Sequence, residues 1–307
     1  IWGKLSPYYR KEANTLNTKG NVVPRVVAAH DLSGVGRCSL SVIIPVLSSM
    51  GIQVCAMPTA LLSTHTGGFT DYTFHDLASD MDGFIHHWKS LGEEFDCFYS
   101  GFVGSGEQMD IMERFLNDFS MDEKLIVIDP VFADNGALYS AFTEEIIDAM
   151  RGFIRHAHII TPNITEASYL LGEDLCAIAS DLSQVKKQIR KLADLGPKTI
   201  VITSMPVEDG KKTVIAYEGQ QDRFFLSSSD YIPEQYPGTG DIFTSVMTGA
   251  LLQGEPLAVA VDRATQFVAK AIRFTYAYNT TPREGVLLEK VLPTVNDPLG
   301  SINYKII

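Results

Sequence analysis

The sequence of 307 residues is poor in cysteine, in positive charge and in long apolar runs. Its four cysteines are scattered and form no C-x-x-C pair, which argues against a zinc ribbon and against a disulfide framework. With 25 basic and 37 acidic residues, the formal net charge of -12 disfavours nucleic acid and anionic membranes as partners. No apolar run approaches the roughly 20 residues of a membrane-spanning helix. Small molecules are therefore the expected ligands.

Several catalytic motifs are also absent. The chain has no G-x-x-x-x-G-K-[ST] and no G-x-G-x-x-G, so it lacks both the P-loop and the dinucleotide-binding fingerprint. It has neither the G-x-S-x-G of serine hydrolases nor the H-E-x-x-H of zinc proteases. Hydrolase functions therefore lose their best support, and any nucleotide must be held by another kind of loop.

The sequence does contain enough apolar material for one large core. Hydrophobic residues make up 45% of it, and no Pro/Gly/Ser-rich linker divides the chain. We expect a polar N-terminal extension over residues 1–21 and a single domain over residues 22–307. Because the extension lacks the apolar centre of a signal peptide, we expect a cytoplasmic protein.

Short, nearly continuous apolar runs alternate with amphipathic segments along that domain. The runs predict strands buried on both faces, and the amphipathic segments predict helices. The predicted strands are 25–29, 53–57, 97–100, 125–128, 159–160 and 199–202. The predicted helices are 39–50, 72–91, 107–119, 143–154, 181–195, 242–253 and 257–276. Residues 213–217 and 223–226 predict an antiparallel hairpin at the sheet edge. This alternation is typical of an α/β protein with a mostly parallel sheet.

Polar residues follow most of the predicted strands. In an open parallel sheet, ligands bind beyond the carboxyl ends of the strands, so we expect these residues to meet at one edge. The segments concerned are 30–36, 63–68, 129–131, 161–166 and 203–204. Carboxylates at strand ends suit a magnesium-bound nucleotide.

The segment Gly238-Thr239-Gly240-Asp241 stands directly before an apolar-periodic stretch. Its glycines predict a turn into a buried helix, whose N-terminal N–H groups can bind an anion such as a transferring phosphoryl group. The Asp241 carboxylate would then face the attacking hydroxyl. An aspartate before a helix is also a common cap, so the motif alone leaves both interpretations open.

In this order and spacing, the motifs resemble those of the ribokinase-like kinases, and within them the vitamin B6 kinases, over about residues 26–292. The most specific are Gly238-Thr239-Gly240-Asp241 and Thr161-Pro162-Asn163 followed by Glu166. The resemblance implies a three-layer αβα sandwich around a central, mostly parallel sheet. It also implies an ATP-dependent kinase that phosphorylates the 5'-hydroxymethyl group of pyridoxal, pyridoxine or pyridoxamine. In such a kinase Asp241 is the base, and Gly238, Thr239 and Gly240 form the anion hole.

The resemblance further implies roles for the other polar residues. The implied substrate-binding residues are Asp31, Ser33, His65, Thr66 and Phe102. The implied ATP-binding residues are Asn163, Thr203, Ser204 and Thr239. Asp129 and Glu166 would hold Mg²⁺ through water molecules. A monovalent cation is left open, and a homodimer is expected because family members often form one.

These residues also have structural interpretations. Glu166 suits the first turn of a helix that Asn163 could cap, Asp31 could close an Asx-turn, and residues 65–66 could form a loop that hydrogen-bonds itself. Residues 30–33 partly resemble hydroxymethylpyrimidine kinases, which leaves that substrate as an alternative. A non-catalytic B6 or nucleotide carrier is a third alternative, against which the complete Gly-Thr-Gly-Asp argues.

Overall fold

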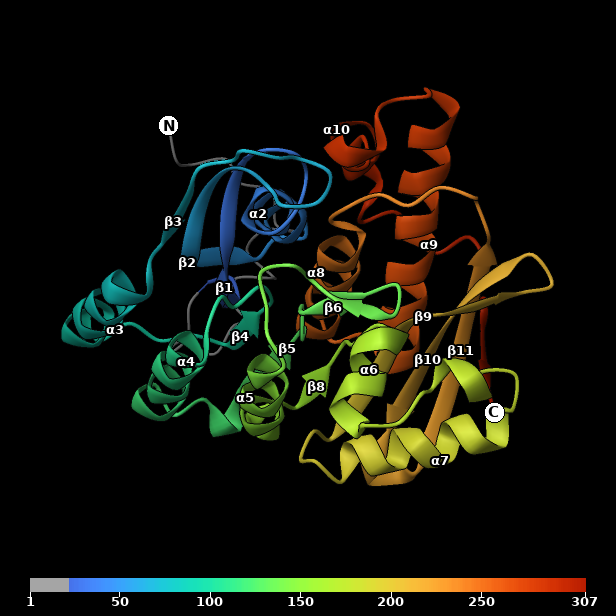
Figure 1. Ribbon diagram of the computed structural model, residues 1–307, viewed down its shortest axis with the longest axis horizontal. Coiled ribbons are helices and arrows are strands. Elements are labelled where there is room, and N and C mark those ends of the chain that lie inside the picture. Colours follow the sequence, from blue (N-terminus) through green and yellow to red (C-terminus); the bar gives the residue numbers. More distant parts are fainter. Residues whose placement is uncertain (1–21) are drawn as a thin grey trace, which may run out of the picture.

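A ten-stranded sheet runs through the molecule in the computed structural model, which describes residues 22–307 (Figure 1). The predicted extension, residues 1–21, lies outside the described residues. The strands are β1 (Arg25–Val35), β2 (Gln53–Thr64), β3 (Phe74–Asp76), β4 (Cys97–Ser100), β5 (Leu125–Ile128), β8 (Ile159–Ile160), β9 (Thr199–Glu208), β10 (Lys211–Glu218), β11 (Arg223–Asp230) and β12 (Tyr304–Ile306). Their order across the sheet is β12-β11-β10-β9-β8-β5-β4-β1-β2-β3. A separate hairpin joins β6 (Ala133–Asp134) to β7 (Ala137–Leu138).

The centre of the sheet is parallel, as the sequence predicts. Strands β2, β1, β4, β5, β8 and β9 run parallel to their neighbours, whereas β3, β10, β11 and β12 pair in the antiparallel sense. The predicted antiparallel hairpin is confirmed as β10 and β11. Its predicted place at the sheet edge is wrong, because β12 pairs with the outer side of β11.

Helices cover both faces of the sheet and complete a three-layer sandwich. One layer contains α3 (Ala78–Leu91), α4 (Gly106–Asp118), α5 (Glu145–Phe153), α6 (Ile164–Leu171) and α7 (Leu182–Ala193). The other contains α2 (Leu40–Ser49), α8 (Thr239–Leu252), α9 (Leu257–Ala277) and α10 (Leu288–Val291). Figure 1 shows the two layers on opposite sides of the strands.

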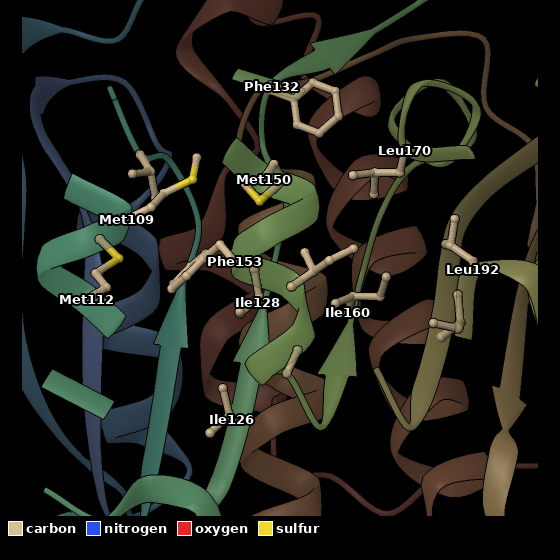
Figure 2. Packing of buried hydrophobic residues seen from close by; sticks show 14 of the residues in the cluster. Met109, Met112, Ile126, Ile128, Phe132, Met150, Phe153, Ile160, Leu170 and Leu192 are labelled. Carbon is tan, nitrogen blue, oxygen red and sulfur yellow. The ribbon is translucent and has the colours of Figure 1, made fainter. Parts of the chain in front are cut away.

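Each helix layer packs a separate apolar core against the sheet. The first core contains Met109 and Met112 of α4, Phe153 of α5 and Ile128 of β5 (Figure 2). Phe153 is fully buried, and burying a side chain of this size contributes roughly 2 kcal/mol. Because strands inserted between two such layers have no polar face, they read as continuous apolar runs in the sequence.

Several predicted boundaries are wrong. Strand β9 continues to Glu208, so Thr203 and Ser204 lie within this strand and not after its end. Strands β1 and β2 continue beyond the apolar runs that predicted them, so the segment 30–35 is part of β1 rather than a loop. Their pairing reaches Val35 and Thr64, with a register shift between His30 and Leu32. The predicted helix 72–91 begins only at Ala78, because residues 74–76 form β3 against β2.

The described helices include none that is both long enough and apolar enough to cross a membrane.

Candidate active site

A cavity of about 1050 Å³ lies where the polar strand ends meet. It is lined by the predicted residues Asp31, His65, Thr66, Phe102, Asp129, Asn163, Glu166, Thr203, Ser204, Gly238, Thr239, Gly240 and Asp241. Ser33 is not among the lining residues. It is buried, and its hydroxyl donates to Asp31 Oδ2 over 2.8 Å, so it contacts the site through that carboxylate. The strand-end rule therefore predicts the position of the cavity, while the role of each residue stays a prediction.

The N-terminus of α8 is open towards this cavity. Gly238 precedes it with a left-handed φ of 78°, and a Cβ there would lie 2.0 Å from the carbonyl oxygen of Arg37, so only glycine fits. The first hydrogen bond of the helix runs from Ile242 N–H to Gly238 O over 3.0 Å. The N–H groups of residues 239–241 are therefore not used by the helix and can bind an anion.

Asp241 lies in the first turn of α8 and does not cap it, since the cap position belongs to Gly238. Its Oδ2 accepts the Ser39 N–H over 2.8 Å, and 12% of the side chain is exposed. Burial, against the effect of that hydrogen bond, raises the pKa of Asp241 to about 7. The hydrogen bond at Oδ2 thus orients the carboxyl group, and its pKa suits proton transfer near neutral pH.

His30 lies behind Asp241 and is completely buried. Its Nδ1 is 3.9 Å from Asp241 Oδ1, and its ring packs against Tyr99 with 4.4 Å between the ring centroids. Burial lowers the pKa of His30 to about 3, so the imidazole is neutral and the contact with Asp241 is not an ion pair.

Asp129 follows β5 and fits a cation. The side chain is buried, and its only described side-chain hydrogen bonds are with two hydroxyls, a long one of 3.5 Å from Thr244 and one with Thr161. Burial and then the charge of Asp241 raise the pKa of Asp129 to about 8. A buried carboxyl group with so little hydrogen bonding gains most from a nearby positive ion. Among the described residues no cluster of three or more metal-ligating side chains occurs, so a metal ion here needs water or substrate oxygens as well.

Glu166 and Asn163 form a capping box at the start of α6. Asn163 Oδ1 accepts the Glu166 N–H over 2.9 Å, and Glu166 Oε2 accepts the Asn163 N–H over 2.8 Å. Glu166 Oε1 also accepts the Phe132 N–H over 3.2 Å. Burial and then the charge of Asp129 raise the pKa of Glu166 well above its usual range. Both residues therefore have the structural role that the sequence offered as an alternative, the capping of α6. Their roles in binding metal and nucleotide stay predictions.

The loop around His65 is held by its own hydrogen bonds, as the structural alternative for residues 65–66 predicts. His65 Nδ1 accepts the Gly67 N–H over 3.1 Å, which leaves Nε2 as the donor to Arg283 O at 2.7 Å. The Arg283 guanidinium in turn lies over the Phe69 ring, 4.8 Å from its centroid. His65 thus joins the loop after β2 to the segment before α10, and both line the cavity.

Sequence reasoning missed several polar lining residues, among them Ser39, Tyr139 and Lys212. Ser39 has a left-handed φ of 49°, which aims its N–H at Asp241. Tyr139 follows the β6–β7 hairpin, and Lys212 lies on β10. No motif marks these positions, because they reach the cavity through loop closure and sheet register.

The family model for phosphomethylpyrimidine kinases matches residues 45–286, which is more than half of the chain. The chain belongs to the phosphomethylpyrimidine kinase family. Family membership and the observed layers agree with the predicted ribokinase-like fold.

Solved structures of relatives cover nearly the whole of this family member. A Bacteroides thetaiotaomicron protein, provisionally assigned as a phosphomethylpyrimidine kinase and crystallised with pyridoxal, is 47% identical, with a TM-score of 0.88. The match covers 93% of this chain and all of that one. Pyridoxal kinase from Lactobacillus plantarum is 32% identical over 89% of this chain and 96% of its own, with a TM-score of 0.78.

Curated relatives carry two kinds of name. The pyridoxine/pyridoxal/pyridoxamine kinase of Bordetella avium is 28% identical over 78% of this chain and 81% of its own length. The thiamine biosynthetic bifunctional enzyme of Arabidopsis thaliana is 24% identical over 87% of this chain, which spans only 50% of that enzyme. This chain is therefore similar both to a protein named as a kinase of B6 vitamers and to the family model named for phosphomethylpyrimidine kinases.

Proposed function

We propose that this protein is a pyridoxal kinase, which transfers the γ-phosphoryl group of ATP to the 5'-hydroxymethyl group of a B6 vitamer. The observation that carries the proposal is the partly buried Asp241 with its raised pKa, beside the unused N–H groups of α8, in a chain 47% identical to a protein crystallised with pyridoxal. The geometry suits a base and an anion site directed at the same point.

The reaction follows from these groups. Asp241 Oδ1 accepts the proton of the hydroxymethyl group while Ser39 N–H holds Oδ2 in place. The N–H groups of residues 239–241 stabilise the charge on the transferring phosphoryl oxygens. Thr203, Ser204 and Asn163 line the cavity on the side where the nucleotide would lie, and Asp31, Thr66 and Phe102 line the side for the pyridine. Phosphoryl transfer needs little more than positioning and charge stabilisation.

Mg²⁺ would be held at Asp129, with Glu166 contacting it through water. Its chemistry would be to neutralise charge on the β- and γ-phosphates. We further propose that the protein is cytoplasmic and forms a homodimer. The family resemblance implies the homodimer, which light scattering of the purified protein would test.

The test is ATP-to-ADP turnover with Mg²⁺ on pyridoxal, pyridoxine, pyridoxamine and hydroxymethylpyrimidine, with Asp241→Asn in parallel. We expect turnover on a pyridine and a fall in kcat of roughly a hundredfold or more in the variant, since a positioned base contributes about that much. Affinity for ATP should change little, because the nucleotide does not depend on that carboxylate for binding. Near-normal turnover in the variant would contradict the role of Asp241.

The same substrates separate the alternatives. Turnover on hydroxymethylpyrimidine alone would keep the mechanism and replace the substrate, as the pyrimidine kinases in the family suggest. Binding of pyridoxal without consumption of ATP would favour a carrier.

A further inference from the structure

The cavity is unusually acidic for a site that must bind a nucleotide. The carboxylates that line it are Asp31, Asp129, Asp134, Glu166, Asp230, Glu234 and Asp241. Among the described lining residues, Lys212 and Arg283 are the only lysine and arginine. ATP brings several more negative charges, so a cation from the protein would oppose repulsion between the cavity and the phosphates.

The two cations lie in different parts of the cavity. Arg283 stacks over Phe69 beside the loop after β2, on the predicted substrate side. Lys212 lies on β10, opposite Ser229 of β11. It therefore belongs to the nucleotide side, together with Thr203 and Ser204 of β9.

Strand geometry places Lys212 beside an apolar part of the cavity. Side chains two residues apart point to the same face of a strand, so Lys212 shares a face with Val214, which packs in the core under α9. Val268 and Ile272 of α9 line the cavity next to Val214 and form an apolar wall suited to a flat base. The charge of Asp134, on the β6–β7 hairpin, acts on Lys212. Lys212 is thus a cavity-lining cation next to the apolar wall and within the electrostatic range of Asp134.

Lys212 makes no hydrogen bond or ion pair with a described side chain, although the charge of Asp134 acts on it from further away. No hydrogen bond or ion pair within the described part of the chain includes its ammonium, whereas the adjacent Lys211 pairs with Asp230 at the surface. Lys212 is half-buried, and this burial lowers its pKa. A partly desolvated cation without a partner costs stability, which an anionic ligand would offset.

We propose that Lys212 binds the phosphate groups of the nucleotide, as a positive charge between the base-binding wall and the anion site of α8. The proposal rests on the proposed function in assuming that the nucleotide occupies this side of the cavity. It adds a residue for ATP affinity to the groups that perform the phosphoryl transfer.

The test compares nucleotide binding by the full-length protein and three variants. Lys212→Met removes the charge and keeps the length of the side chain, and Lys212→Arg keeps the charge. Lys187→Met is the matched control, because Lys187 is exposed on α7 in the opposite helix layer. Dissociation constants for ATP, ADP and adenosine are measured by calorimetry with Mg²⁺, and KM values for ATP and pyridoxal by turnover.

We expect Lys212→Met to weaken ATP and ADP binding about tenfold or more, the usual effect of losing a charge-assisted hydrogen bond. Adenosine binding and the KM for pyridoxal should not change, Lys212→Arg should recover most of the affinity, and Lys187→Met should behave as the wild type. Unchanged ATP affinity would overturn the proposal, and so would an equal loss for adenosine, which would indicate damage to the base site.

These outcomes are separable from failure of the proposed function. If the wild type binds ATP but phosphorylates no B6 vitamer, the pyridoxal kinase proposal fails. The Lys212 proposal is then still tested by the dissociation constants of the wild type and the variants. If the wild type binds no nucleotide at all, the Lys212 proposal is wrong as well.

Discussion

At the scale of single residues, the reactivity of the site depends on how one carboxyl group is held. Ser39 N–H occupies Asp241 Oδ2, so Oδ1 is the oxygen left to take a proton. The neutral His30 behind it adds no positive charge that would keep the carboxyl ionised. Burial is therefore the larger effect, and Asp241 has the raised pKa expected of a base that works near neutral pH.

This pKa predicts a pH profile. The ionised form of Asp241 is the base, so activity should be lost as the pH falls through the pKa of about 7. Below that midpoint kcat/KM should fall about tenfold per pH unit, as for a single ionisation. A cation bound near Asp129 would shift the midpoint downwards. Steady-state rates between pH 5 and 9 check this.

The control is the residual activity of Asp241→Asn on the same substrate. If the substrate is the group that ionises, the variant should show the same pH dependence as the wild type. If Asp241 is that group, the pH dependence should disappear in the variant. A profile with the same slope in both proteins would assign the titration to the substrate and contradict the prediction.

Most site residues could be predicted from sequence because strand ends in a parallel sheet converge. Asp129 and Asn163 are examples, since Asp129 directly follows one short apolar run and Asn163 comes three residues after another. Ser39 and Lys212 could not be found that way. Ser39 reaches Asp241 from 202 residues away through a left-handed backbone conformation, and Lys212 depends on the register of an antiparallel hairpin.

At the scale of elements, the start of α6 combines structure and function in one side chain. Glu166 accepts backbone N–H groups from its own helix cap and from the segment after β5. Burial raises the pKa of Glu166 well above its usual range. A glutamine at this position carries no charge and keeps one of the two acceptor oxygens, whereas an alanine keeps neither.

We predict that Glu166→Gln loses about 1 kcal/mol of stability, because its NH2 group leaves one buried N–H without an acceptor, and that it requires more Mg²⁺ for half-maximal activity. Glu166→Ala should lose more stability, roughly 2 kcal/mol, since it leaves buried N–H donors on both sides without acceptors. Thermal unfolding followed by circular dichroism and Mg²⁺ titrations of activity measure the two effects. Unchanged Mg²⁺ dependence in Glu166→Gln would restrict Glu166 to the capping box.

The parallel centre of the sheet was predictable from sequence and its margins were not. Strands β4, β5 and β8 match the predicted ranges because their residues are buried on both faces. The ends of β1 and β2 carry polar residues and glycine, and they form a strand pair only because each supplies backbone partners for the other. Strand ends that form through such pairing have no apolar pattern in the sequence, so they cannot be predicted from it.

At the scale of the whole molecule, an acidic chain gathers ionisable carboxyl groups in its interior. Asp129 and Asp241 are both held away from water, and the charge of Asp241 disfavours the ionised form of Asp129. A folded protein without a cation here must either keep a proton on these groups or accept repulsion between them. The site is therefore a source of instability that ligands relieve.

The pH dependence of stability follows from this arrangement. The pKa of Asp129 is raised from its ordinary 3.8 to about 8 in the fold, so its contribution to stability is complete below pH 4 and is lost as the pH rises to about 8. Asparagine carries no charge at any pH. We predict that Asp129→Asn is more stable than the wild type at pH 8, by on the order of a few kcal/mol, and nearly equal to it at pH 4.

Urea unfolding of the ligand-free proteins at pH 4, 6 and 8 would measure this difference, with Asp110→Asn, an exposed position on α4, as the control. Mg²⁺ with ADP should reverse the order at pH 8, because a cation stabilises the ionised Asp129 and has less to bind in the variant. Asp129→Asn should also lose most of its activity. A variant that is less stable than the wild type at pH 8 would show that Asp129 is compensated within the fold, and the site would then have no unmet need for a cation.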